Sequence, residues 1–314
     1  MRAHGLNFKR PQKPSLAPIA LLHRPGDDEH SVSFARKTWF HGQECWEDVC
    51  NVPAKELREW FPELVDQLQE DSFYSVNGFM TPKRNEQPTR KSPHVPELAA
   101  SCRRYPRWLC ACYADLDGYK HGVSDGQLVG ALLDMRSSGQ LPPFSMLTLS
   151  GRGVWAFWFL RTEEGTGPVP YFPMRSLYAK VQRAIGSRLA HLHSDAQARD
   201  SARVTRIPGS RHTIAKRNVE YLVLYDEHGR PYLHTLSALA EFFGVRAEER
   251  PRAIAVLRGS DPTAQLQGLR GAIGRWRKDL QRFEALRELR GGFRQGCRAH
   301  ALRLATLGLL IVHV

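Results

Sequence analysis

The sequence contains no long apolar run, no excess of acidic residues and no CxxC cysteine pair. A helix that spans a membrane needs about 18 to 20 consecutive apolar residues, and the most apolar stretch, residues 307–314, is far shorter. The N-terminal MRAHGLNFKRPQKPSL is basic but lacks the apolar centre of a secretory signal. We therefore expect a soluble, cytoplasmic protein with no membrane partner.

What the sequence has instead is positive charge. Its 314 residues include 45 Lys and Arg against 32 Asp and Glu, a net charge of +13, and 42% of them are hydrophobic. The hydrophobic share excludes a disordered chain, and the length fits about two domains of roughly 150 residues each. The excess of cations favours a polyanionic partner, which means nucleic acid or nucleotides. A GC-rich genome that favours arginine would produce the same charge without such a partner.

The six cysteines do not indicate a disulfide framework, because disulfides are rare in a cytoplasmic protein. His41, Cys45 and Cys50 form at most half of a zinc site, since their spacing is poor for metal ligands. Cys110 and Cys112 flank an apolar residue and are expected to be buried as small hydrophobic side chains.

The chain divides into four regions: a poorly ordered leader over residues 1–30, a mixed domain over 31–245, a linker over 246–262 and a helical module over 263–314. Hydrophobic spacing predicts strands at 73–79, 108–114, 144–149, 154–160 and 219–225, and helices at 54–68, 128–135, 174–192 and 236–243. Residues 81–96 are expected to form a mobile loop. The order predicts an α/β (α+β) domain followed by a small all-α C-terminal module. The chain ends within an apolar run, expected to be a docked helix or the end of a shortened protein.

Asp115 and Asp117 follow directly on the apolar strand predicted at 108–114. Side chains alternate along a strand, so two acids one residue apart point to the same face. Gly118 then lets the chain turn sharply. Paired carboxylates of this kind suit Mg²⁺ or Mn²⁺. Taken alone, the pair equally fits a solvated strand end or the nucleotide-sugar site of a glycosyltransferase.

Two further polar segments fit phosphate chemistry. The turn Ser150-Gly151-Arg152-Gly153 offers backbone amides, a hydroxyl and a guanidinium, all of which bind phosphate oxygens. An ordinary hairpin turn is the alternative interpretation. Asp195 is a candidate for a third acid of the site, and Asp200 is the alternative candidate. The cations that follow would neutralise a triphosphate or simply form a solvated loop: Arg203, Arg206, Arg211 and Lys216.

In this order the segments resemble the three motifs of archaeo-eukaryotic primases: Tyr113-Ala-Asp115-Leu-Asp117-Gly118, then Ser150-Gly-Arg-Gly153, then Asp195 with Arg203-Val-Thr-Arg206-Ile-Pro-Gly-Ser210. The likeness covers roughly residues 73–225. Among these primases, the motifs most resemble those of primase-polymerase domains in replication proteins of plasmids, phages and integrative elements. It implies a primase-polymerase-like catalytic domain with an RRM-like sheet, and the C-terminal region resembles the helical module that often follows such domains.

The resemblance also implies roles for individual residues: Asp115, Asp117 and Asp195 as catalytic ligands of Mg²⁺ or Mn²⁺ in a two-metal site, Ser150 and Arg152 as contacts of the nucleotide, and Arg203, Arg206 and Lys216 as contacts of triphosphate or template. The implied activity is that of a DNA primase, a DNA-dependent nucleotidyltransferase. It synthesises primers from NTP or dNTP substrates on a single-stranded DNA template during replication of a mobile element, by two-metal phosphoryl transfer. A replicative helicase is a candidate partner.

The chain departs from the family at the second motif. Many members have a histidine there, and this sequence has none between Ser150 and Arg161. An arginine such as Arg152 replaces a histidine that only binds phosphate, but not one that acts as a neutral imidazole. Trp155, Phe157 and Trp158, on the strand that follows, fit either a base-stacking face or the core.

Two alternatives from other classes remain open. A catalytically inactive replication initiator or single-strand DNA-binding module on the same fold is favoured by the absent histidine. The intact carboxylates disfavour it, because buried acids without cations repel one another. The pattern His191-x-His193-x-Asp195 is similar to the HxHxD of binuclear zinc hydrolases, but Ala196 stands where that family has a further histidine.

Overall fold

The computed structural model of the chain describes residues 6–23, 30–40, 43–80 and 106–246. All of these belong to one unit, Met1–Glu248. The second unit, Glu249–Val314, lies outside the described residues. The predicted helical module, most of the predicted linker and the predicted loop at 81–96 therefore lie outside them as well. No helix in the described ranges is long and apolar enough to cross a membrane.

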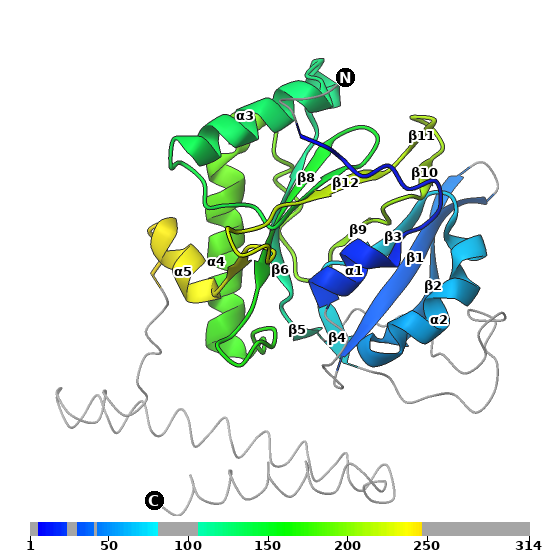
Figure 1. The fold of residues 1–314 in the computed structure, drawn as a ribbon, viewed down its shortest axis with the longest axis horizontal. Coiled ribbons are helices and arrows are strands. Elements are labelled where there is room, and N and C mark those ends of the chain that lie inside the picture. Colours follow the sequence, from blue (N-terminus) through cyan, green and yellow to red (C-terminus); the bar gives the residue numbers. More distant parts are fainter. Residues whose placement is uncertain (1–5, 24–29, 41–42, 81–105, 247–314) are drawn as a thin grey trace, which may run out of the picture. The chain divides into compact units, whose positions relative to one another are not determined.

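The described unit is built on two β-sheets (Figure 1). One sheet has the order β5-β4-β1-β3-β9, with β2 also paired to β1, and consists of β1 (His30–Phe40), β2 (Gln43–Pro53), β3 (Ser72–Ser75), β4 (Gly78–Met80), β5 (Pro106–Trp108) and β9 (Val204–Arg206). The other has the order β12-β7-β8-β13, with β6 also paired to β8, and consists of β6 (Ala111–Leu116), β7 (Met146–Leu149), β8 (Val154–Leu160), β12 (Glu220–Val223) and β13 (Leu233–His234). A short hairpin, β10 (Arg211–His212) and β11 (Arg217–Asn218), follows β9.

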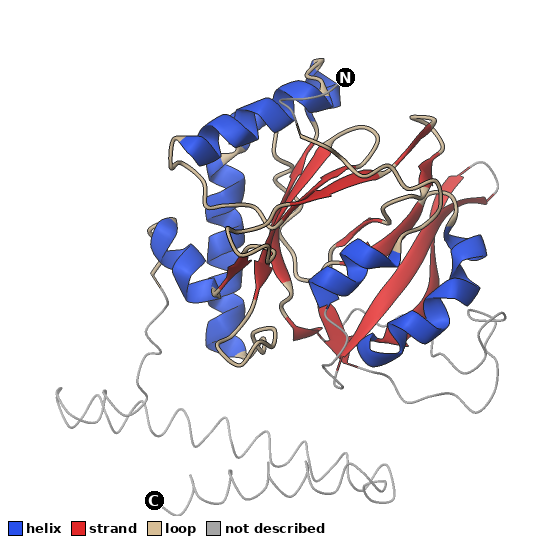
Figure 2. Cartoon of the chain, in the orientation of Figure 1, coloured by secondary structure: helices blue, strands red, loops and turns tan. Residues whose placement is uncertain are grey.

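The helices divide between the two sheets. Figure 2 shows α3 (Asp125–Ser137), α4 (Phe172–Arg188) and α5 (Leu236–Phe242) on the outer side of the five-stranded sheet. Helices α1 (Leu16–His23) and α2 (Leu57–Leu64) lie beside the six-stranded sheet. Short 3₁₀ turns complete the set: η2 (Ala54–Glu56), η3 (Val65–Leu68), η4 (Gly118–His121) and η5 (Ala190–Leu192).

Strand β8 contributes to two hydrophobic cores. All seven of its residues are buried, and alternate side chains face opposite sides of the sheet. Trp155, Phe157 and Phe159 pack in the core that contains residues of β1, β2, α1 and α2. Val154 and Trp158 pack in the core with α3 and α4. The continuous apolar run of β8 is thus typical of a strand covered on both faces.

The mixed α/β class predicted from the sequence is confirmed, and the predicted strands and helices of the five-stranded layer are found. Helix α3 begins at a capping box. There the Ser124 hydroxyl accepts the Gln127 backbone N–H at 3.3 Å, and Gln127 Oε1 accepts the Ser124 backbone N–H at 2.9 Å. The long hairpin β1–β2 was not predicted, because half of the residues in its strands are polar and only the start of β1 alternates clearly, with Val32 and Phe34 next to serines.

The described part of the N-terminal segment differs from the poorly ordered leader expected from its composition. Lys9 pairs with Tyr221 of β12 through two backbone hydrogen bonds of 2.8 and 3.1 Å. Helix α1 follows, and its Ile19 and Leu22 are fully buried in the first core. The prolines and cations of the segment obscured a short apolar helix whose burial against the sheets orders it.

Candidate active site

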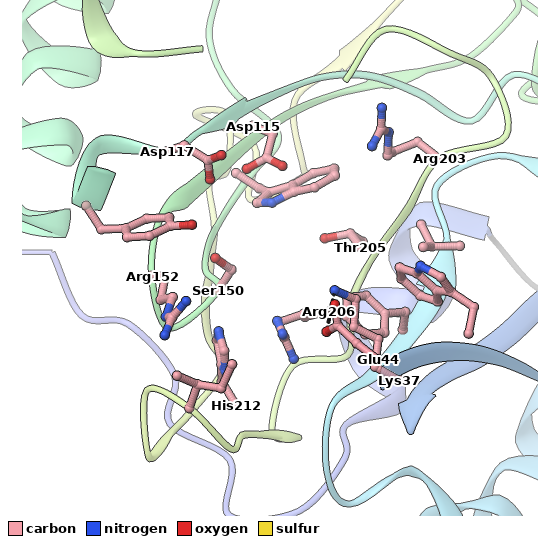
Figure 3. A pocket seen from close by; sticks show the side chains of 16 residues that line it. Lys37, Glu44, Asp115, Asp117, Ser150, Arg152, Arg203, Thr205, Arg206 and His212 are labelled. Carbon is pink, nitrogen blue, oxygen red and sulfur yellow. Dashed lines mark ion pairs between the residues drawn. The ribbon is translucent and has the colours of Figure 1, made fainter. Parts of the chain in front are cut away.

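A cavity of about 350 Å³ lies where the end of β6 and the β7–β8 turn face strands β1, β2, β3 and β9 (Figure 3). Six of the eight residues that the sequence pointed to line it: Asp115, Asp117, Ser150, Arg152, Arg203 and Arg206. Asp195 does not line the cavity. Lys216 does not line the cavity either, and it is exposed in the turn that joins β10 to β11. The three segments, far apart in sequence, therefore bring most of the predicted site together.

The two acids of the first motif lie side by side at one end of the cavity (Figure 3). Burial raises the pKa of Asp115 to about 8, and repulsion from the carboxylates of Asp117 and Asp195 adds to the effect. Asp117 forms an ion pair with Lys120, three residues further along the chain. Burial and the neighbouring carboxylates thus make the ionised form of Asp115 unfavourable, and a bound cation would offset both effects.

Asp195 is held beside the first motif by backbone pairing. Its N–H donates to the Asp115 carbonyl at 2.8 Å, and the Asp117 N–H donates to the His193 carbonyl at 3.0 Å. The Asp195 carboxylate accepts the Gln197 N–H at 2.8 Å, which directs one oxygen back to its own loop. The structure therefore places the third acid next to the pair, close enough to raise the pKa of Asp115, but not on the cavity wall.

The β7–β8 turn approaches the first motif closely because two of its residues are glycine. A Cβ at Gly153 would lie 2.3 Å from the Leu116 carbonyl oxygen, so only glycine fits against that strand. Gly151 has φ +101°, and a Cβ there would lie 2.8 Å from the ring of His212. The turn is closed by the Ser150 N–H, which donates to the Gly153 carbonyl at 2.9 Å.

Cations line the part of the cavity across from the acids (Figure 3). Within the described ranges Arg152 has no carboxylate partner, and its guanidinium lies 5.4 Å from the centre of the Tyr119 ring. Arg206 donates to the Asp71 carboxylate at 2.6 Å, and Arg203 pairs with Asp200 at 3.0 Å. Arg152 is therefore the cation with most freedom to bind a phosphate.

His212 is a cavity residue that the sequence analysis missed. Its ring is buried, packs against Gly151 of the turn, and has an Nδ1 atom without a hydrogen-bond partner. Burial, followed by the nearby charge of Arg206, lowers the pKa of His212 to about 4. The imidazole is thus neutral at pH 7, and its 3.6 Å approach to Asp71 is not an ion pair there. No local pattern links residue 212 to a turn about sixty residues earlier, so only the fold reveals it.

The β1–β2 hairpin supplies a second group that the sequence analysis missed. Trp46 is 52% exposed, and its ring lies 4.8 Å from that of Phe73 on the cavity wall. Lys37 Nζ lies 5.1 Å from the Trp46 ring and pairs with Glu44 at 2.8 Å. Of the aromatic residues named from β8, Trp155 lines the cavity while Phe157 and Trp158 are buried in the cores. Aromatic rings beside cations are the usual groups that stack on nucleic-acid bases.

Asp115 and Asp117 have the donor chemistry for Mg²⁺ or Mn²⁺, because these ions prefer carboxylate oxygens. The raised pKa of Asp115 agrees with that fit, since it reflects first the burial of the carboxyl and then repulsion from Asp117 and Asp195, both of which a bound cation would offset. The oxygens of these two acids and Asp195 are not all within 4.8 Å of one another.

The zinc-hydrolase interpretation gains no support from the fold. Among the described residues, His191, His193 and Asp195 do not form a group with all ligand atoms within 4.8 Å. His193 instead stacks on His121, with ring centres 3.8 Å apart. His41, of the half zinc site considered above, lies outside the described residues, and Cys50 is buried in the first core.

Comparison with known proteins gives distant similarities. No protein-family model matches the chain. A replication protein from Clostridium perfringens is 26% identical over 184 residues, which are 56% of this chain and 39% of that protein. The match therefore spans about two fifths of that relative.

Three solved structures with weaker likeness to the chain are described as primases or primase domains. The AEP domain of the cyanophage S-2L primase-polymerase matches with a TM-score of 0.44 and 13% identity, over 75% of this chain and 98% of that domain. Primase RepB′ matches with a TM-score of 0.38 and 14% identity, over 87% of this chain and 74% of that chain. The catalytic domain of RepB′, solved in complex with initiator DNA, matches with a TM-score of 0.35 and 12% identity. The match covers 69% of this chain and 86% of that chain. The predicted resemblance to replication proteins is confirmed by the distant sequence match.

Proposed function

We propose that this chain is a DNA-dependent nucleotidyltransferase that synthesises primers on single-stranded DNA. One observation carries the proposal: a single cavity presents paired carboxylates at one end and arginines with a neutral histidine at the other (Figure 3). A nucleoside triphosphate with its divalent cation has the matching charges, because the cation binds the acids and the phosphates bind the arginines. The distant relationship to a replication protein supports the same conclusion.

In this proposal Arg152 and the Gly151–Gly153 part of the turn hold the triphosphate. Arg206, fixed by Asp71, adds a second positive charge on the opposite wall. His212 provides the neutral imidazole that the second motif lacks in sequence, because it packs against Gly151 of that turn. The Nδ1 atom of His212 is buried and faces Asp71, so Nε2 is the ring atom that would hydrogen-bond a phosphate oxygen without carrying a charge.

At the other end Asp115 and Asp117 would hold Mg²⁺ or Mn²⁺, and Asp195 would act from beside them. When bound, the ion supplies Lewis-acid polarisation of the α-phosphate and stabilises the attacking hydroxyl of the primer or first nucleotide. The protein aligns the two reactants and offsets charge on the departing pyrophosphate through Arg152 and Arg206. Lys120 contacts only the Oδ2 atom of Asp117, so it would either share this carboxylate with the ion or release it.

The template would bind along the β1–β2 hairpin, where Trp46 and Phe73 offer ring faces next to Lys37. Stacking on such rings does not depend on base identity, which suits a template of any sequence.

A catalytically inactive module that binds single-stranded DNA is the second candidate, and the ion pair between Lys120 and Asp117 favours it. A lysine that permanently neutralised Asp117 would remove one ligand of the ion. The cations and aromatic rings of the cavity would then serve binding alone.

Incorporation of labelled nucleotide on a single-stranded template, with Mg²⁺ or Mn²⁺, tests both candidates. We expect the full chain to make template-dependent product. The double variant Asp115→Ala, Asp117→Ala should lose about a hundredfold or more of this activity while binding the template about as well as the unaltered chain. The matched control is Asp134→Ala, which removes an exposed acid of α3 outside the cavity. Synthesis that survives in the double variant refutes the proposal, and template binding without synthesis by the unaltered chain establishes the second candidate.

A further inference from the structure

A cluster of two histidines and one cysteine lies inside the first core, away from the cavity described above. His23 ends α1, His30 begins β1, and Cys110 immediately precedes β6. All three are buried, and one ligand atom of each lies within 4.8 Å of the other two. Cys110 Sγ is 3.7 Å from His23 Nδ1. In a tetrahedral zinc site the sulfur and nitrogen ligands lie about 3.5 Å apart, as follows from zinc–ligand bonds of roughly 2.3 and 2.0 Å.

The surroundings of His23 orient it as a metal ligand. Its Nε2 lies 2.8 Å from the Ser75 carbonyl oxygen, which accepts a hydrogen bond only if Nε2 carries the proton. The lone pair of a neutral His23 is then on Nδ1, the atom that faces Cys110. A carbonyl that fixes the tautomer from the far side of the ring is the usual partner of a metal-bound histidine.

His30 is the least explained polar side chain of the core. Only 1% of the residue is exposed, and neither ring nitrogen has a hydrogen-bond partner. Leaving both nitrogens buried and unbonded is unfavourable, so such rings are rare without a ligand. The position is nevertheless shaped for the ring, because a Cβ at Gly78 would lie 2.4 Å from His30 Cδ2. Bonding a metal satisfies one of the two nitrogens.

We propose that His23, His30 and Cys110 bind one zinc ion that ties α1 and β1 to the start of β6. Imidazole and thiolate ligands select zinc over the Mg²⁺ or Mn²⁺ expected at the aspartates. Burial lowers the pKa of both histidines, which favours the neutral form that binds metal. Arg161 donates to the Leu21, Leu22 and Leu160 carbonyls, and the thiolate of Cys110 offsets one charge of the ion beside it.

A zinc ion bound here would fix the start of β6, the strand that contains Asp115. Cys110 is five residues before Asp115, and β6 runs straight from one to the other. This role does not depend on the proposed activity, because it concerns the stability of the fold.

Metal analysis of the purified full chain tests the proposal. We expect about one zinc per chain, and about none in Cys110→Ala or His30→Ala. The matched control, Cys112→Ala, removes an equally buried cysteine that packs in the other core, and should keep the zinc. Replacing zinc with Co²⁺ should give the thiolate charge-transfer absorption in the unaltered chain and in Cys112→Ala only.

These measurements also separate the site from others. Zinc retained in Cys110→Ala but lost in Cys45→Ala would place the ion elsewhere and overturn the proposal. A purified chain that contains no zinc and gives no Co²⁺ absorption would also overturn it, whether or not the variants fold. Nucleotide incorporation is not used as a readout, so failure of the proposed activity leaves this result unchanged.

Discussion

Replacing Asp115 with asparagine should make the protein more stable while removing its activity. The carboxyl has a pKa raised from 3.8 to about 8, so the folded state must either bury its charge or bind a proton that the unfolded chain releases. Because the folded pKa is the higher one, the penalty is absent below about pH 4, grows as the pH rises, and is complete above about pH 8. An asparagine side chain carries no charge to bury, so Asp115→Asn should gain stability over that range.

The size of the effect follows from the same shift. At about 1.4 kcal/mol for each tenfold change in the protonation equilibrium, the full shift corresponds to roughly 5–6 kcal/mol above pH 8. Asp115 is partly exposed to the cavity, and water there reduces the penalty, so we expect about 2 kcal/mol. For a domain of this size that is an increase in Tm of about 4–8 °C at pH 8, and of less than about 2 °C at pH 5.

Thermal unfolding followed by circular dichroism at the two pH values measures the difference. Asp134→Asn is the matched control, because Asp134 is exposed on α3 and should change Tm little at either pH. Adding Mn²⁺ should raise the Tm of the unaltered chain but not that of Asp115→Asn. A variant that is no more stable at pH 8, or equally more stable at pH 5, would refute the view that Asp115 is buried without a compensating cation.

Three other substitutions test the remaining parts of the site. Asp71→Asn should destabilise the fold by about 2–4 kcal/mol at pH 7 because it breaks a largely buried pair with Arg206. Hydrogen bonds from Thr213 and Arg206 outweigh burial and lower the pKa of Asp71, so this loss should shrink as the pH falls below about 4 in urea titrations. His212→Ala should raise the nucleotide KM or lower kcat by about tenfold or more, the worth of one hydrogen bond to a charged phosphate, and an unchanged kcat/KM would contradict its role. Trp46→Ala should weaken binding of single-stranded DNA by about tenfold in fluorescence anisotropy, whereas exposed Tyr171→Ala, outside the cavity, should not.

The parts of the site that could be predicted from sequence are those in which spacing alone fixes geometry. Asp115 and Asp117 share a face because strand side chains alternate, and the cavity contains both. The turn at residues 150–153 joins two strands whose apolar runs are unmistakable. Asp195 lies beside the pair, but the direction of its side chain depends on a loop hydrogen bond to Gln197 that no periodicity predicts.

Other parts depend on long-range contacts. His212 meets the turn because β9 and the β10–β11 hairpin carry it across from the other sheet, and Trp46 reaches Phe73 through the pairing of β2 with β1 and of β1 with β3. The N-terminal segment was predicted to be poorly ordered for a related reason. Helix α1 is ordered by packing against the sheets rather than by helix propensity.

The cavity walls are held in place by interactions that are unfavourable without a ligand. Asp71 adopts φ +41°, a left-handed conformation rare for a residue other than glycine, and there it fixes Arg206. Asp115 is buried beside two further acids, and His212 has an unpaired nitrogen. Strain, acid repulsion and an unsatisfied polar atom would each lower stability in a purely structural cavity. A triphosphate with its divalent cation would relieve the acid repulsion, because the cation compensates the acids. That complementarity is the physical argument for the proposed nucleotidyl transfer over DNA binding alone, since DNA binding does not need an acid at residue 115.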